Sequence, residues 1–143
     1  MLLKKRSVEA ARVNLMQYIV AIAVIGILLL QSSGAIPRDS VGGSMVIALA
    51  FFLGALAVGV HEAWTKKRHV LGWIVNIVVA FVGAFLVAAP GGMVVAMLLR
   101  PFMGGSPSLA AAGGPVMHVA LAGMMIVTLL GAWGALWVVS RWR

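Results

Sequence analysis

Four apolar runs divide this sequence, and each is long enough to cross a lipid bilayer. They cover residues 13–30, 44–63, 70–89 and 116–139, and a transmembrane helix needs about 20 mostly apolar residues. A backbone inside hydrocarbon must satisfy its own hydrogen bonds, so each run is expected to form a helix. The runs lack the alternation typical of membrane β-strands. The sequence therefore predicts an all-α integral membrane protein, with residues 1–143 forming one polytopic domain of four transmembrane helices.

The amino-acid composition also indicates an integral membrane protein. Hydrophobic residues make up 63% of the chain and charged residues only 10%, whereas a soluble domain has about 25% charged residues. The net charge of +8 would suggest nucleic acid binding in a soluble protein. Here the basic residues flank the apolar runs, so no nucleic acid partner is expected. The absence of cysteine excludes disulfides and thiolate metal sites.

The basic residues predict the orientation of the chain in the membrane. With four spans, nine of the eleven Lys and Arg residues fall on one side, and only Arg38 and Arg100 fall on the other. Segments rich in Lys and Arg stay in the cytoplasm, so both termini are predicted to be cytoplasmic. We expect the inner basic residues to contact anionic lipid headgroups. These residues include Lys4, Lys5, Arg6, Lys66, Lys67, Arg68, Arg141 and Arg143.

The tryptophans give a second indication of the inner boundary. All five occur near the predicted inner ends of the runs: Trp64, Trp73, Trp133, Trp137 and Trp142. Indole rings favour the headgroup level of a bilayer, where one side of the ring is apolar and the other is wet. Trp133 lies furthest from its helix end, and for this residue packing in the core is an equal alternative.

The third apolar run carries a stripe of small or polar residues at every fourth position. Small residues allow transmembrane helices to approach closely, because lipid provides no hydrophobic force between them. Residues four apart differ by about 40° around a helix, so the stripe winds and is expected to meet several neighbours. We predict that the third helix is central, and that its stripe packs against the other helices of the bundle or against another copy of the chain. Its members are Gly72, Asn76, Ala80, Ala84, Ala88, Gly92 and Ala96.

Pro90 is expected to break or kink the third helix. Its ring cannot donate to the carbonyl of Leu86 and crowds that group. From Val70, Pro90 comes after about 30 Å of helical rise, which is the thickness of the hydrocarbon core. The break is therefore expected at the outer interface, with a possible extension of the helix to residue 99.

Polar side chains near the inner boundary are few. Asn76 lies at a depth similar to that of Asn14 and Gln17 on the first helix, so the three amides form a possible polar cluster that joins these helices. A polar vestibule for a solute is the alternative. Glu62 precedes Lys66 by four residues, which favours an ion pair on the helix surface.

The sequence offers no recognised reactive chemistry, so no enzyme activity, metal or cofactor is expected. His61, Glu62 and His69 do not match a metal motif and stand beside three cations. His118 is expected to face headgroups or to bond to the adjacent loop. No serine has an acid and a histidine positioned near it in sequence.

Two segments allow alternative interpretations. Residues 101–115 are rich in glycine and uncharged, and they are expected to form an irregular loop near the outer surface, with a re-entrant segment as the alternative. The first run is expected to remain as an anchor. The alternative is a signal peptide cleaved after Ala35.

Two functional hypotheses follow. The first is a non-enzymatic accessory or assembly subunit that forms a homo-oligomer or joins a larger membrane complex, because the chain has packing chemistry without reactive chemistry. The second is an oligomeric channel or small permease, including a phage-type pore, for an unidentified small solute. The composition and short loops suggest a bacterial inner membrane.

Overall fold

The computed structural model describes residues 2–36, 41–67, 69–107 and 113–142, and for residues 2–14, 41 and 42 it describes the backbone alone. The described chain consists of long helices joined by short connections. They are α1 (Leu2–Ser32), α2 (Val41–Thr65), α3 (Val70–Leu99) and α5 (Gly114–Arg141), with a short 3-10 helix, η1 (Arg100–Phe102), after α3. Each of the four α-helices is long and apolar enough to cross a membrane. The fold is therefore that of an all-α, four-span membrane protein, as the sequence predicts.

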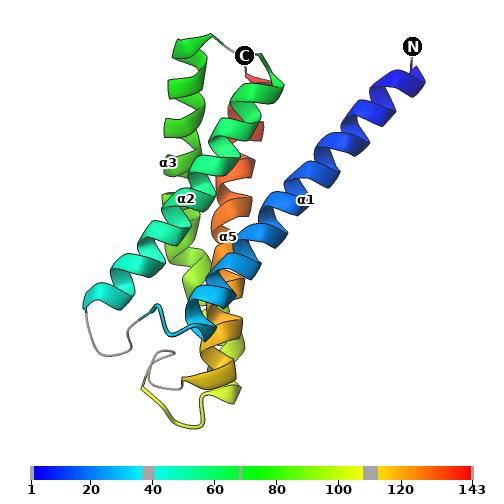
Figure 1. Cartoon of the computed structure of the whole chain (residues 1–143). Helices are drawn as coiled ribbons and strands as arrows, with labels where there is room; N and C mark the ends of the chain where they lie inside the picture. The colour runs from blue at the N-terminus through cyan, green and yellow to red at the C-terminus, as the bar shows by residue number, and fades with distance from the viewer. Residues whose placement is uncertain (1, 37–40, 68, 108–112, 143) are drawn as a thin grey trace.

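The helices form a bundle in which the chain reverses direction after each span (Figure 1). Helices α2, α3 and α5 lie together, and α1 crosses them at an angle. The C-terminal half of α1 contacts the bundle, whereas its N-terminal half leans away from the other helices (Figure 1). Both ends of the described chain lie at the same end of the molecule (Figure 1). This end is called the inner end below, following the prediction from the basic residues.

The core lies where α2, α3, α5 and the C-terminal half of α1 meet. Its largest fully buried side chains are those of Ile27, Val58, Met125, Leu129 and Leu136. Three of these residues belong to α5, which is also the helix with the largest buried share of its span, 44%. Helix α5 is therefore the central helix of the bundle, and the prediction that the third helix is central is wrong, because only 22% of the α3 span is buried.

Helix α3 continues through Pro90 to Leu99, so the possible extension is present and the expected break is not. Proline is tolerated within membrane helices when neighbouring helices hold the freed backbone in place. Here α5 contacts α3 directly after the proline. The contact is close, since a Cβ added to Gly91 would collide with Val127. With 30 residues, α3 rises about 45 Å, which exceeds the hydrocarbon core, so the helix must tilt or project beyond it.

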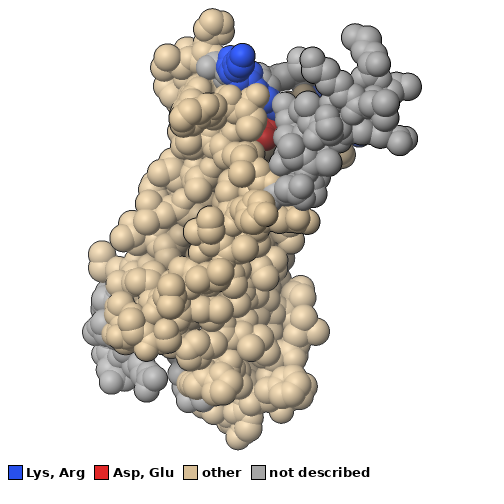
Figure 2. Space-filling view, turned by 45° about the vertical axis from the view of Figure 1, so that its right-hand side comes forward, with Lys and Arg blue, Asp and Glu red and all other residues tan. Residues whose placement is uncertain are grey.

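The inner end gathers most of the charged side chains of the described chain, and Arg100 lies at the other end. On the face shown in Figure 2, the blue and red side chains lie at one end of a surface that is otherwise neutral. Glu62 forms the predicted ion pair with Lys66. The rings of Trp64 and Trp73 lie 6.4 Å apart across the α2–α3 turn. Trp133 is exposed, so packing in the core, the alternative for this residue, does not hold.

Candidate functional site

The first half of the small-residue stripe lies against α2. Asn76, Ala80 and Ala84 are buried. On the facing helix, a Cβ added to Gly59 would lie 3.1 Å from the Ile77 Cα atom and 3.3 Å from the Ala80 Cβ atom. The two backbones thus approach closely at this level. Glycine on α2 and alanine on α3 permit that approach, as expected for helices in lipid.

A second row of small residues on α3 makes the closest contact with α5. A Cβ added to Gly83 would lie 2.6 Å from the Gly131 carbonyl oxygen, and one added to Gly131 would lie 2.7 Å from the Val87 Cβ atom. Neither position has space for even a methyl group. Gly83 and Gly91 are buried and lie outside the stripe. The sequence analysis missed these two glycines, because residues eight apart differ by about 80° around a helix and do not stand out as one stripe.

The remaining members of the stripe are less enclosed. Gly72, Ala88, Gly92 and Ala96 are half-buried. A Cβ added to Gly92 would lie 3.5 Å from the Met124 methyl group, which is an ordinary contact. For the members from Ala88 onward, the winding expected for the stripe explains this difference, because successive members turn away from α2.

Three buried polar atoms lack a hydrogen-bond partner among the described residues. They are Gln31 Oε1, His61 Nε2 and Asn76 Nδ2. His61 and Asn76 lie towards the inner end, on α2 and α3, and Gln31 lies near the outer end of α1. Between these levels the interior is filled by apolar side chains, including Met125, Leu129 and Ala132, each at most 1% exposed. The described residues of one chain therefore form no continuous polar path.

The structure does not bring Gln17 to Asn76. Gln17 is exposed on α1, whereas Asn76 is buried on α3. The side chain of Asn14 lies outside the described residues. The physical reason is the course of α1, whose N-terminal half leans away from the bundle (Figure 1). The sequence places the three amides at similar depths but does not determine this helix angle.

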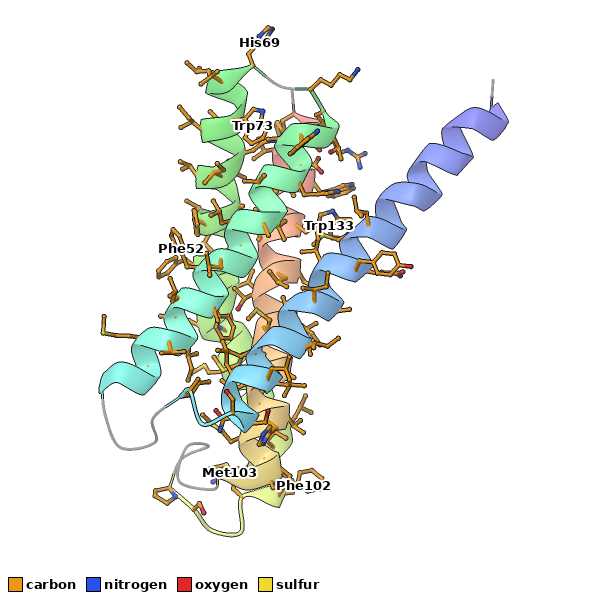
Figure 3. The ribbon with its side chains drawn as sticks, in the orientation of Figure 1. Phe52, His69, Trp73, Phe102, Met103 and Trp133 are labelled. Carbon is orange, nitrogen blue, oxygen red and sulfur yellow. The ribbon has the colours of Figure 1, made fainter. Side chains whose placement is uncertain are left out.

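The proposed headgroup residues are only partly described. Lys66 and Lys67 lie at the turn after α2, and Arg141 ends α5, where its guanidinium stands 5.6 Å from the centre of the Trp137 ring. Arg68 and Arg143 lie outside the described residues, as do the side chains of Lys4, Lys5 and Arg6. Figure 3 shows His69 and Trp73 at this same end, and Phe102 and Met103 at the other.

The histidines of the described chain are divided between the two ends of the bundle. His118 Nδ1 donates to the Gly114 carbonyl oxygen at 2.7 Å, so this side chain bonds within the first turn of α5, next to the loop that was expected to bind it. His61 and His69 lie at the inner end. Among the described residues, no three His, Asp or Glu side chains gather as they would around a metal ion.

Comparison with known proteins identifies no relative of the chain. No protein-family model, curated protein or solved structure matches it.

Proposed function

We propose that this chain is a small accessory or assembly subunit without catalytic chemistry, and that it packs with copies of itself or with a larger membrane complex. The observation that carries the proposal is the exposure of α1. Only 6% of its apolar span, Leu15–Ser32, is buried inside the protein, against 44% for α5. A helix that is so lightly packed on its own bundle remains free to contact a second protein.

The polar character of α1 supports the same proposal. Gln17 lies within the apolar span and is exposed. An amide in hydrocarbon gains from a partner, and a hydrogen bond between membrane helices contributes about 0.6 kcal/mol on average. Tyr18, the adjacent residue, is also exposed. A neighbouring membrane helix would supply partners for both groups. We further propose a bacterial inner membrane as the location, with the basic end facing the cytoplasm.

Site-specific photo-cross-linking tests this proposal. A benzophenone amino acid at Ile22 on α1 should form adducts with protein, because that side chain is 69% exposed on the helix that we expect to dock. The same group at Val78 on α3 serves as the control, since that side chain is 54% exposed. Both residues lie about 11 Å along their helices from the inner ends of their spans. We expect the control to label mainly lipid.

The adducts also identify the partner. Cross-linked material purified in mild detergent should contain either a dimer of this chain or a second membrane protein, as read by mass spectrometry. If Ile22 and Val78 both label only lipid, and the chain purifies as a monomer without a companion, the accessory proposal is wrong.

One observation favours the alternative of an oligomeric channel: the buried atoms His61 Nε2 and Asn76 Nδ2 have no hydrogen-bond partner among the described residues. Such groups occur along solute paths in membrane proteins. An oligomer would have to complete the path, because the middle of the described bundle is filled by apolar side chains.

Replacing Asn76 by leucine separates the two functions. For an accessory subunit we expect no solute flux in reconstituted vesicles, and a change in stability within about 1 kcal/mol, because the lost amide has an unpaired donor. Val78→Leu on the exposed face of α3 serves as the control. Flux that is present in the parent protein and in the Val78 variant, but disappears with Asn76→Leu, would favour the channel instead.

A further inference from the structure

A groove of about 830 Å³ opens on the bundle between α2, α3 and α5. Four of the five phenylalanines of the chain line it: Phe51, Phe52, Phe81 and Phe85. The rings of Phe52 and Phe81 stack with their centres 4.5 Å apart, and Figure 3 shows Phe52 midway along the bundle. The groove thus has aromatic walls that come from two different helices.

The bottom of the groove is formed by small residues. Ala55 and Ala84 belong to its lining, and they are 1% and 5% exposed. The one polar side chain in the described lining is Thr128, whose hydroxyl donates to the Met124 carbonyl oxygen at 2.8 Å. The lining therefore offers no free hydrogen-bonding side chain to a ligand, and an occupant would be held by dispersion and shape.

The position of the groove matches one leaflet of a bilayer. Along α2 it runs from Met45, one turn from the outer end of the helix, to Ala55. The ten steps from Met45 to Ala55 rise about 15 Å, which is half of the hydrocarbon core of about 30 Å. Beyond Ala55 the groove closes, because Gly59 brings α2 into contact with the Ile77 backbone.

We propose that this groove binds an acyl chain of a glycerophospholipid from the outer leaflet. The surrounding medium supplies hydrocarbon at high concentration, and an unfilled groove would lose dispersion contacts along its whole length. An acyl chain ends near the bilayer midplane, where the groove also ends. A spanning helix of a second protein fits less well, because the closed contact at Gly59 would force it out of the groove at mid-membrane. This inference is independent of the proposed docking of α1.

Photoactivatable phosphatidylcholine in reconstituted vesicles tests the proposal. A diazirine at the end of the acyl chain should label the midplane end of the groove, near Ala55 and Phe81. A diazirine close to the glycerol should label the outer end, near Met45 and Ala88. Mass spectrometry of the digested protein reads both positions. Equal labelling of groove residues and of Leu29, a residue that is exposed on α1, would overturn the proposal.

A matched pair of variants tests the groove itself. Ala88 lines the groove, whereas its neighbour Ala89 is exposed and does not. We expect Ala88→Leu to lower groove labelling about fivefold, because the larger side chain occupies the site, and we expect Ala89→Leu to leave it unchanged. Ala48→Leu fills the groove from α2 and must have the same effect as Ala88→Leu.

The remaining outcomes are also decisive. Thermal unfolding in detergent checks that each variant is folded, and the two groove variants are read independently of each other. If groove labelling persists in both folded variants, the lipid does not occupy this groove. If a photoreactive group at Phe85 cross-links a second copy or another protein in place of lipid, the occupant is a protein and the proposal is wrong.

Discussion

Gly131→Ala is expected to destabilise the bundle by about 3 kcal/mol, the upper end of the range for overpacked cores. The new methyl group would lie 2.7 Å from the Val87 Cβ atom and 2.9 Å from the Gly83 carbonyl oxygen. The Gly83 oxygen belongs to the α3 backbone and the Val87 Cβ atom is bonded directly to it, so a rotamer change cannot relieve the collision. The two helices must move apart, and the contacts along their whole interface weaken together.

Gly134 provides the control on the same helix. A Cβ added there meets no atom within 4 Å, and alanine favours a helix over glycine by about 1 kcal/mol. Gly134→Ala is therefore expected to be neutral or stabilising, so the two substitutions should have opposite signs. Reversible unfolding in mixed micelles, followed by circular dichroism, measures both. Equal effects of the two variants would contradict the close approach of α3 and α5.

The sequence predicts much of this fold because the bilayer limits the alternatives. Hydrophobic length alone identifies four helices, since a spanning backbone must bond within itself. An even number of spans brings both termini to one end, which Figure 1 shows. The ion pair of Glu62 with Lys66 was also predictable, because residues four apart on a helix are neighbours whatever the tertiary structure.

The contacts between helices could not be predicted in the same way. The stripe beginning at Gly72 was assigned to packing as a whole, yet the closest approach of two helix backbones is between Gly83 and Gly131, outside the stripe. Small residues are common on every face of these helices, so composition does not determine which face meets which neighbour. That choice depends on the crossing angles, which are set by all the side chains at each interface.

The candidate site was less predictable than the fold. Asn76 was expected to meet Gln17, but the lean of α1 leaves Gln17 exposed. The phenylalanine groove joins residues from three helices and has no linear motif. Pro90 was expected to break or kink α3, but the helix continues through it to Leu99 and packs against Val127 of α5 at Gly91. In each case the deciding contact lies outside the segment that suggested the expectation.

Leu129→Ala should have the other large effect, a loss of about 2 kcal/mol of stability. Leu129 is 0% exposed, and its Cδ2 atom lies 3.1 Å from the position that a Cβ on Gly54 would take, so the side chain packs directly over the α2 backbone. In soluble proteins, Leu→Ala in a core costs about 2–5 kcal/mol, which combines transfer from water with the cavity that is left behind. Lipid removes most of the transfer contribution, because the unfolded helices remain in hydrocarbon. We therefore expect a cost at the low end of that range.

Leu130 is the matched control for this comparison. It is the next residue of α5 and is 51% exposed. In Leu130→Ala, lipid fills the space that the shortened side chain leaves, so few contacts within the protein are lost. Its effect should stay within about 0.5 kcal/mol, as for most surface substitutions. Unfolding of both variants in the same micelles gives the difference directly. Equal small losses of stability in the two variants would contradict the packing of Leu129 against Gly54. If Leu130→Ala loses much stability only at high protein concentration, a second chain covers this face.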